Sequence, residues 1–191
     1  MARIKEYDEN EVLQKAMELF WEQGYEKTSM QELVTHMGIH RRSLYDTFGD
    51  KHTLFMSALD RYEELIGIKV ASQVKPLASV KQAIRRLFEI AIYRNDNKAI
   101  GCLTVNTAVE LSQHDEEVAE KVVDSFLKTE QLLTDLLLRG QSSGEIAPHH
   151  DAKKLSQFMH NSLVGLRVQV KTSDDKQKLE SIIDMTLSVL D

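Results

Sequence analysis

The 191-residue sequence has only two prolines, eight glycines and one cysteine, Cys102. A single cysteine cannot form an internal disulfide, so nothing in the sequence indicates an oxidising compartment. No apolar run approaches the roughly 18 residues that span a membrane. The opening residues MARIKEYDENEV are charged and lack the apolar segment of a signal peptide. These absences predict a soluble, cytoplasmic protein with no membrane partner.

Positive charge is also scarce: 24 Lys and Arg residues stand against 30 Asp and Glu residues, for a formal net charge of −6. This balance argues against coating nucleic acid over the whole surface, although it leaves room for a local basic patch. The sequence contains no nucleophile–base arrangement, glycine-rich phosphate loop or metal-binding motif. We therefore do not expect an enzyme, and we identify no cofactor.

The scarcity of proline and glycine favours an all-α fold. Apolar residues recur at helical spacing in about nine segments. Ser29 with Glu32 predicts a capping box at the start of the second helix, and Asp50 is the expected N-cap of the fourth. The expected helices cover approximately residues 10–22, 30–37, 40–47, 51–72, 79–95, 102–112, 115–140, 151–171 and 175–190.

The second and third expected helices are short and are joined by a tight turn at Gly38, which is the layout of a helix-turn-helix. The third helix offers only Leu44, with Phe48 just beyond it, to a core. Arginine can pair with guanine or phosphate, and hydroxyl groups can donate to phosphate. The free surface would carry His40, Arg41, Arg42, Ser43 and Tyr45, with Lys51 just beyond and Thr28 and Ser29 at the start of the second helix. A solvated charged helix with no DNA partner is the alternative, since residues 1–60 hold more acids than bases.

The segment AMELFWEQGYEKTSMQELVTHMGIHRRSLYDTFGDKHTLF resembles the N-terminal DNA-binding domain of TetR-family transcriptional regulators. Matching features are LF…GY, the TS that opens the second helix, MGI in the turn and SLYDTFGDKHTLF. The resemblance implies a helix-turn-helix domain over 1–50 and a larger helical ligand-binding and dimerisation domain over 51–191, with the fourth helix connecting them. The DNA contacts that it implies fall on Thr28, Ser29, His40, Arg41, Arg42, Ser43, Tyr45 and Lys51. Many members of the family have Ser or Thr in place of His40, whose role stays open.

Two apolar helices are expected at the end of the sequence, over 151–171 and 175–190. The first has a stripe of Leu155, Phe158, Met159, Ser162, Leu166 and Val170, and the second has Leu179, Ile182, Ile183, Thr186 and Leu190. Such helices suit a four-helix dimer interface, and the alternative is that they only cover an intramolecular core. The resemblance favours a homodimer, which would place two recognition helices about one DNA turn apart on a near-palindromic double-stranded operator.

The resemblance also implies a pocket for an unknown small-molecule inducer among the fifth to eighth helices. Its expected lining is Phe88, Ile92, Cys102, Asn106, Met159 and Leu163, each of which could instead be plain core. Asn106, His160 and Arg167 are polar groups that could orient a ligand. His149 and His150 adjoin a proline-containing loop, but two neighbouring histidines without a third ligand do not define a metal site.

The sequence therefore leaves three functions open. The leading one is a dimeric repressor whose ligand shifts the spacing of its recognition helices. The second is a repressor that senses oxidants or electrophiles through Cys102, because GCLTVNTAVEL resembles a subset of the family in which a cysteine opens this helix, and a helix N-terminus favours a thiolate. The third is a helical protein-interaction module without DNA binding.

Overall fold

A computed structural model describes residues 7–92 and 101–191 of the chain, and this part of the chain is all-α, as predicted. The expected helix over 79–95 runs past Ile92 into residues that lie outside this description. The helices are α1 (Glu9–Gln23), α2 (Met30–Met37), α3 (Arg41–Phe48), α4 (Lys51–Gln73), α5 (Val80–Ile92), α6 (Leu103–Glu110), α7 (Glu116–Ser143), α8 (Ala152–Gln169) and α9 (Lys176–Leu187), followed by the 3-10 turn η1 (Ser188–Leu190).

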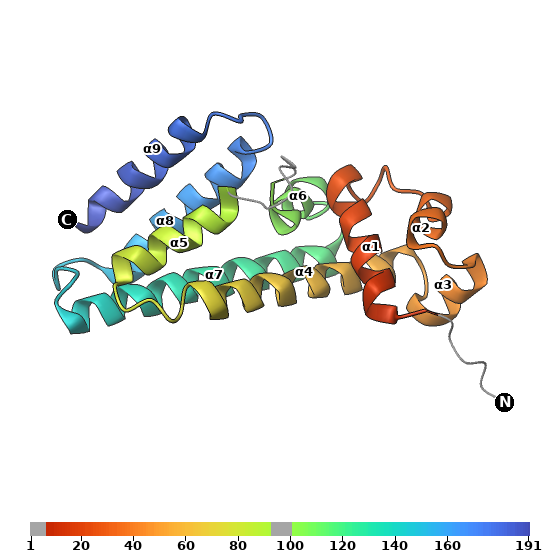
Figure 1. Cartoon of the computed structure of the whole chain (residues 1–191), viewed down its shortest axis with the longest axis horizontal. Coiled ribbons are helices and arrows are strands. Elements are labelled where there is room, and N and C mark those ends of the chain that lie inside the picture. The colour runs from red at the N-terminus through yellow and green to blue at the C-terminus, as the bar shows by residue number, and fades with distance from the viewer. Residues whose placement is uncertain (1–6, 93–100) are drawn as a thin grey trace.

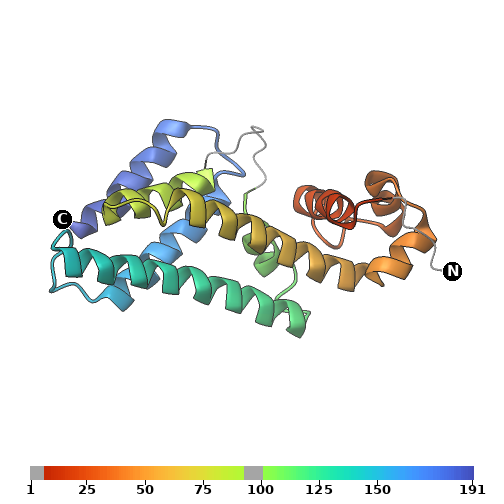
Figure 2. The ribbon, with the colours of Figure 1, turned by 60° about the horizontal axis from the view of Figure 1, so that its bottom comes forward.

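The molecule is elongated, with α1, α2 and α3 gathered at one end and α5, α8 and α9 at the other (Figure 1). The two longest helices, α4 and α7, run side by side along the long axis and connect the two ends (Figures 1 and 2). Lys128 of α7 bridges to Glu63 of α4, with 3.0 Å between Nζ and Oε2. No helix of the described residues is long and apolar enough to cross a membrane.

Short polar side chains fix where most of these helices begin. Ser29 and Glu32 form the predicted capping box, in which Ser29 Oγ accepts from the Glu32 N–H and Glu32 Oε2 accepts from the Ser29 N–H. Asp50 caps α4 as predicted, by accepting from the Thr53 N–H at 2.8 Å. The helices α3 and α6 differ, because their N-cap residues, His40 and Cys102, make no side-chain capping bond.

The buried side chains form two cores that divide the long helices between them. In the first core, Phe20 of α1 packs edge-on against Phe55 of α4, with 5.0 Å between ring centroids. This core also holds Cys102 and residues of α6 and the first half of α7. The second core joins the end of α4 with α5, the second half of α7, α8 and α9. The end of the molecule that holds α1, α2 and α3 therefore shares its core with α6 and α7.

Candidate DNA-binding surface and ligand cavity

One face of α3 is anchored and the opposite face is open. Leu44 is the fully buried residue of α3. Beside it, the Tyr7 hydroxyl hydrogen-bonds Thr47 Oγ1 at 2.7 Å and lies 3.4 Å from the Ser43 carbonyl oxygen. Arg41, Arg42 and Tyr45 point away from this anchor and are exposed. The anchored helix thus presents two cations and a phenol to solvent.

Neither arginine of this face forms a buried ion pair with another described residue. Arg41 stands over the Tyr45 ring, with 5.8 Å between the guanidinium carbon and the ring centroid. The Arg42 side chain is 91% exposed and lies 3.6 Å from Asp46 Oδ2. Exposed pairs of this kind contribute little free energy, so either guanidinium can exchange its partner for a phosphate or a base.

The other predicted contacts differ in how accessible they are. His40 and Ser29 are exposed, Ser43 is half-buried, and Lys51 Nζ lies 4.2 Å from the centroid of the Tyr25 ring. Thr28 is fully buried, and its hydroxyl donates to the Gly24 carbonyl oxygen at 2.6 Å. We therefore correct the expectation for Thr28, because its hydroxyl satisfies the end of α1 and cannot reach a phosphate.

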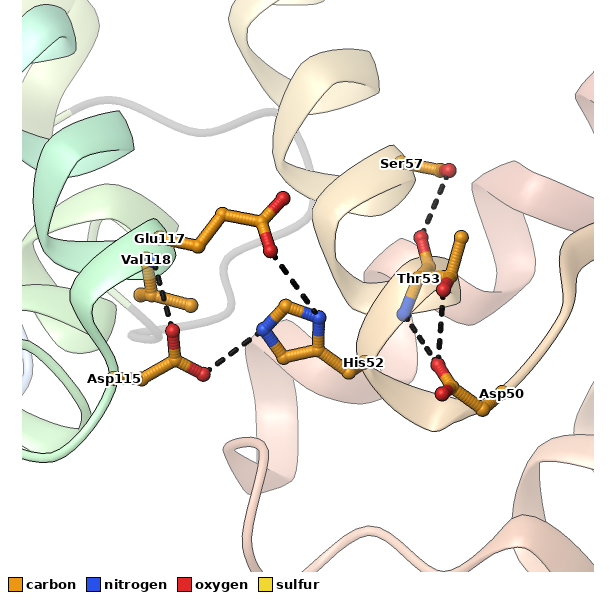
Figure 3. Close-up of polar contacts among 7 residues, drawn as sticks. All are labelled: Asp50, His52, Thr53, Ser57, Asp115, Glu117 and Val118. Carbon is orange, nitrogen blue, oxygen red and sulfur yellow. Dashed lines mark hydrogen bonds and ion pairs between the residues drawn. The ribbon is translucent and has the colours of Figure 1, made fainter.

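Two polar links that the sequence does not reveal join this end of the molecule to the rest. His52, in the first turn of α4, places Nε2 2.9 Å from Asp115 Oδ2, and Nδ1 3.9 Å from Glu117 Oε2 (Figure 3). Asp115 at the same time caps α7 through the Val118 N–H at 3.0 Å. The second link is Glu110, the last residue of α6, whose carboxylate accepts from backbone N–H groups of the turn after α1.

A cavity of about 300 Å³ opens between α4 and α7, and residues of α6 and α8 close it. The apolar part of its lining includes Ile66, Val70 and Leu132. The polar part includes Tyr62, Cys102 and Arg167. This size lies at the low end of the roughly 300–1,000 Å³ that is typical of ligand pockets.

The cavity differs from the predicted pocket in position and lining. Of the six predicted lining residues, Cys102 alone is among those that border it. Phe88, Met159 and Leu163 are fully buried in the second core, and Ile92 packs against that core. Asn106 accepts from Lys171 Nζ at 3.0 Å. Helix periodicity identifies these residues as inward-facing, but it cannot tell a packed interior from a hollow one, because that depends on the spacing between helices.

Burial perturbs two ionisable groups at and behind the cavity wall. Burial raises the pKa of the Tyr62 hydroxyl well above its usual value, and the neighbouring Cys102 thiol adds to this. Burial also lowers the pKa of His160, and the nearby Arg167 charge acts in the same direction. Glu130, whose Oε1 lies 3.3 Å from His160 Nδ1, acts against this shift. Tyr62 and His160 are therefore both neutral at pH 7.

The outward faces of α8 and α9 carry large apolar side chains. Phe158 and Val168 of α8 are 47% and 46% exposed, and Met185 of α9 is 72% exposed. Leu166, which the predicted stripe grouped with Phe158, is buried in the second core of its own protomer. The stripe read from the sequence thus combined one residue of an outward face with several residues of the core.

The described residues contain no group of three His, Cys, Asp or Glu side chains placed to hold a metal ion. The rings of His149 and His150 lie against each other in a tilted arrangement, with 4.2 Å between ring centroids. Their arrangement adds no third ligand within the described part of the chain.

These features define a helix-turn-helix protein with a separate cavity, and comparisons with known proteins agree. Residues 12–58 match the family model for bacterial regulatory proteins of the tetR family, and residues 80–186 match the tetracyclin repressor-like C-terminal domain. The chain is 37% identical over 194 residues to the HTH-type transcriptional regulator YezE of Bacillus subtilis, with 100% of both chains covered. It is 31% identical over 188 residues to the HTH-type transcriptional repressor ComR of Escherichia coli, covering 97% of this chain and 90% of that one.

The fold has a close counterpart among solved structures. A cysteine mutant of the TetR-family transcriptional regulator CifR, complexed with a 26-bp double-strand operator, superposes with a TM-score of 0.89 at 27% identity, with 100% of both chains covered. The protein is therefore a transcriptional regulator of the helix-turn-helix class. It belongs to the TetR family.

Proposed function

We propose that the protein represses transcription as a cytoplasmic homodimer without catalytic activity, and that it binds a near-palindromic DNA operator through α3. The observation that carries this proposal is the open face of α3, where Arg41, Arg42 and Tyr45 stand opposite the anchored Leu44. We assign the DNA contacts to this face and its borders. The proposed contact residues are Ser29, His40, Arg41, Arg42, Ser43, Tyr45 and Lys51.

The outward faces of α8 and α9 support the dimer. Phe158, Val168 and Met185 are exposed apolar side chains on neighbouring helices. Gly165 lies on the same side of α8, and a Cβ added to it would meet no atom within 4 Å. A second copy could therefore approach α8 closely and bury these side chains, as in a four-helix interface.

Ligand binding in the cavity would weaken the operator complex by changing the distance between the two recognition helices of the dimer. The cavity supports this role because α4 and α6, which line it, also pack against α1 in the first core. A ligand that binds more tightly to the dimer with one helix spacing than to the dimer with the other shifts the population toward the first state.

A gel-shift assay with the DNA that flanks the protein's own gene tests the proposal. We expect a discrete retarded complex with a near-palindromic footprint, and an affinity that falls steeply with salt because phosphate contacts release counterions. The matched control is a DNA fragment of equal length and base composition. Equal retardation of both fragments, or of neither, contradicts the proposal.

The second candidate is a repressor that senses oxidants or electrophiles through Cys102. It is favoured by the position of the thiol, which borders the cavity next to the Tyr62 hydroxyl while being only 3% exposed. A reagent would have to enter the cavity to reach it. If Cys102 is the sensor, alkylation at neutral pH releases the operator, and Cys102→Ser binds DNA without this response. Operator binding that is insensitive to alkylation rejects the candidate.

A further inference from the structure

The cavity wall contains a cation that has no counter-ion among the residues that the structure describes. Arg167 of α8 is half-buried at the cavity. Among the described residues, no carboxylate lies within ion-pair distance of its guanidinium. Tyr62 and His160 are close enough for the Arg167 charge to affect their pKa values, and both are neutral at pH 7. A positive charge that is partly removed from water and left unpaired is unfavourable, so a bound anion would stabilise this site.

The remaining charges of the cavity do not supply that anion. Glu63 is the acidic residue of the described lining, and its carboxylate already accepts from Lys128 Nζ at 3.0 Å. Lys75, which also lines the cavity, is an exposed cation. The lining therefore has an excess of positive charge, and its potential favours a negatively charged ligand.

The rest of the lining sets the size and character of the ligand. Ile66, Val70 and Leu132 provide an apolar surface, and the volume of about 300 Å³ leaves space for a small molecule only. An inorganic anion would leave this apolar surface uncovered. The planar guanidinium fork matches a carboxylate, which it can bind through two parallel hydrogen bonds.

We propose that the cavity binds a small organic carboxylate, with its carboxylate group on Arg167 and its hydrocarbon or aromatic body against Ile66, Val70 and Leu132. This inference rests on the proposed function in one respect, namely that the cavity is the inducer site. The ligand chemistry itself can be tested on the protein alone.

The experiment measures binding to the full-length protein without DNA, by thermal shift and calorimetry. The probes are benzoate, phenylacetate, hexanoate and octanoate, each paired with its neutral primary amide, together with inorganic phosphate. We expect at least one carboxylate to bind saturably and at least tenfold more tightly than its amide. Absence of any such preference, or equally strong binding of phosphate, overturns the inference.

Four variants locate the site. Arg167→Gln should remove the tenfold preference, and Arg167→Lys should retain part of it. Lys153→Gln, which removes an exposed cation from the same helix, should leave it unchanged. Gly67→Leu should block binding, because Gly67 lines the cavity and has open space around its Cβ position, so the variant can fold. Carboxylate binding that survives both Arg167→Gln and Gly67→Leu overturns the assignment.

Operator release is then measured separately, so that the two proposals can fail independently. A carboxylate that binds to the cavity but leaves the operator complex intact contradicts the inducer role and preserves the ligand chemistry. If the amides release the operator as effectively as the carboxylates, the proposed ligand chemistry is contradicted and the inducer role is preserved.

Discussion

The carboxylate of Glu110 lies directly against Gly24, so that a Cβ at Gly24 would stand 2.8 Å from Glu110 Oε2. Glu110 ends α6, and its two oxygens accept from the backbone N–H groups of Tyr25 and Glu26 at 3.1 and 2.9 Å. Cys102, at the other end of α6, borders the cavity. One two-turn helix therefore runs from the cavity to the turn that precedes the helix-turn-helix.

Replacing Glu110 with Gln should lower the free energy of unfolding by about 1–2 kcal/mol, because hydrogen bonds to a charged acceptor are the stronger kind and an amide offers one acceptor in place of two. Urea denaturation measures the change. Glu120→Gln, an exposed residue on α7, is the control and should change stability by less than about 0.5 kcal/mol. Equal losses in the two variants would show that the Glu110 contact contributes nothing specific.

Replacing glycine with alanine should change the stability of the protein in opposite directions at Gly24 and at Gly67. Gly24 has φ 86° and ψ 170°, a region almost restricted to glycine, so Gly24→Ala should destabilise the protein by about 1–3 kcal/mol and displace Glu110. Gly67 lies inside α4 with open space around its Cβ position, so Gly67→Ala should stabilise it by about 0.5–1 kcal/mol. Calorimetric melting of the two variants tests both signs. A loss of stability in Gly67→Ala would contradict the second.

On α3, Arg41→Ala and Arg42→Ala should each weaken operator binding while leaving the melting temperature nearly unchanged, because both side chains are exposed. An arginine that reads a base should cost about 1–3 kcal/mol and relax one position of the site, whereas a phosphate contact should weaken all sequences alike. Fluorescence anisotropy with single-base operator variants separates these outcomes. Full affinity in the double variant would reject α3 as the recognition helix.

For the dimer, the informative position is Phe158. Phe158→Glu should produce monomers in sedimentation, because a carboxylate would be buried at the interface without a partner. Val109→Glu replaces a more exposed apolar residue on α6 and should leave the dimer intact. Leu166→Glu should instead unfold the protomer, since Leu166 is 1% exposed within its own core. A Phe158→Glu protein that stays dimeric would show that the dimer interface lies elsewhere.

His160 should make the protein less stable in mild acid. Its pKa is lowered in the folded state, so the unfolded chain binds the proton more readily. The stability contribution of a neutral His160 is therefore complete above its unfolded pKa, about 6.5, and is lost as the pH falls below that value. The difference in melting temperature between pH 7.5 and pH 5.5 should be smaller in His160→Gln than in the parent. An unchanged difference would assign the acid sensitivity to other groups.

The sequence predicts well those structural features that depend on residues close together in the chain. The capping box of Ser29 and Glu32 lies within one turn, and the exposure of Arg41 and Arg42 follows from the single inward position, Leu44. The resemblance supplied the role of this helix. In each case the structural outcome depends on a short stretch of chain.

The parts that the sequence could not predict depend on how distant segments meet. Thr28 matches the family motif, yet its hydroxyl is used by the Gly24 carbonyl. The cavity depends on how far apart α4 and α7 lie, and these helices are bridged by Glu63 and Lys128, which are 65 residues apart in the sequence. Apolar periodicity gives the direction of each side chain, and it contains no information on that separation. The domain boundary at residue 50 stays a prediction.

The shared first core has a consequence for protein engineering. Regulators of this kind invite hybrids that join the DNA-reading segment of one protein to the sensing segment of another. Here such a junction at residue 50 would leave Phe20 and Leu44 on one side and their core partners Leu103, Leu111 and Val118 on the other. The two parents of a hybrid must therefore match in these packing residues, and a graft that also carries the first half of α4, α6 and the first half of α7 keeps the original core complete.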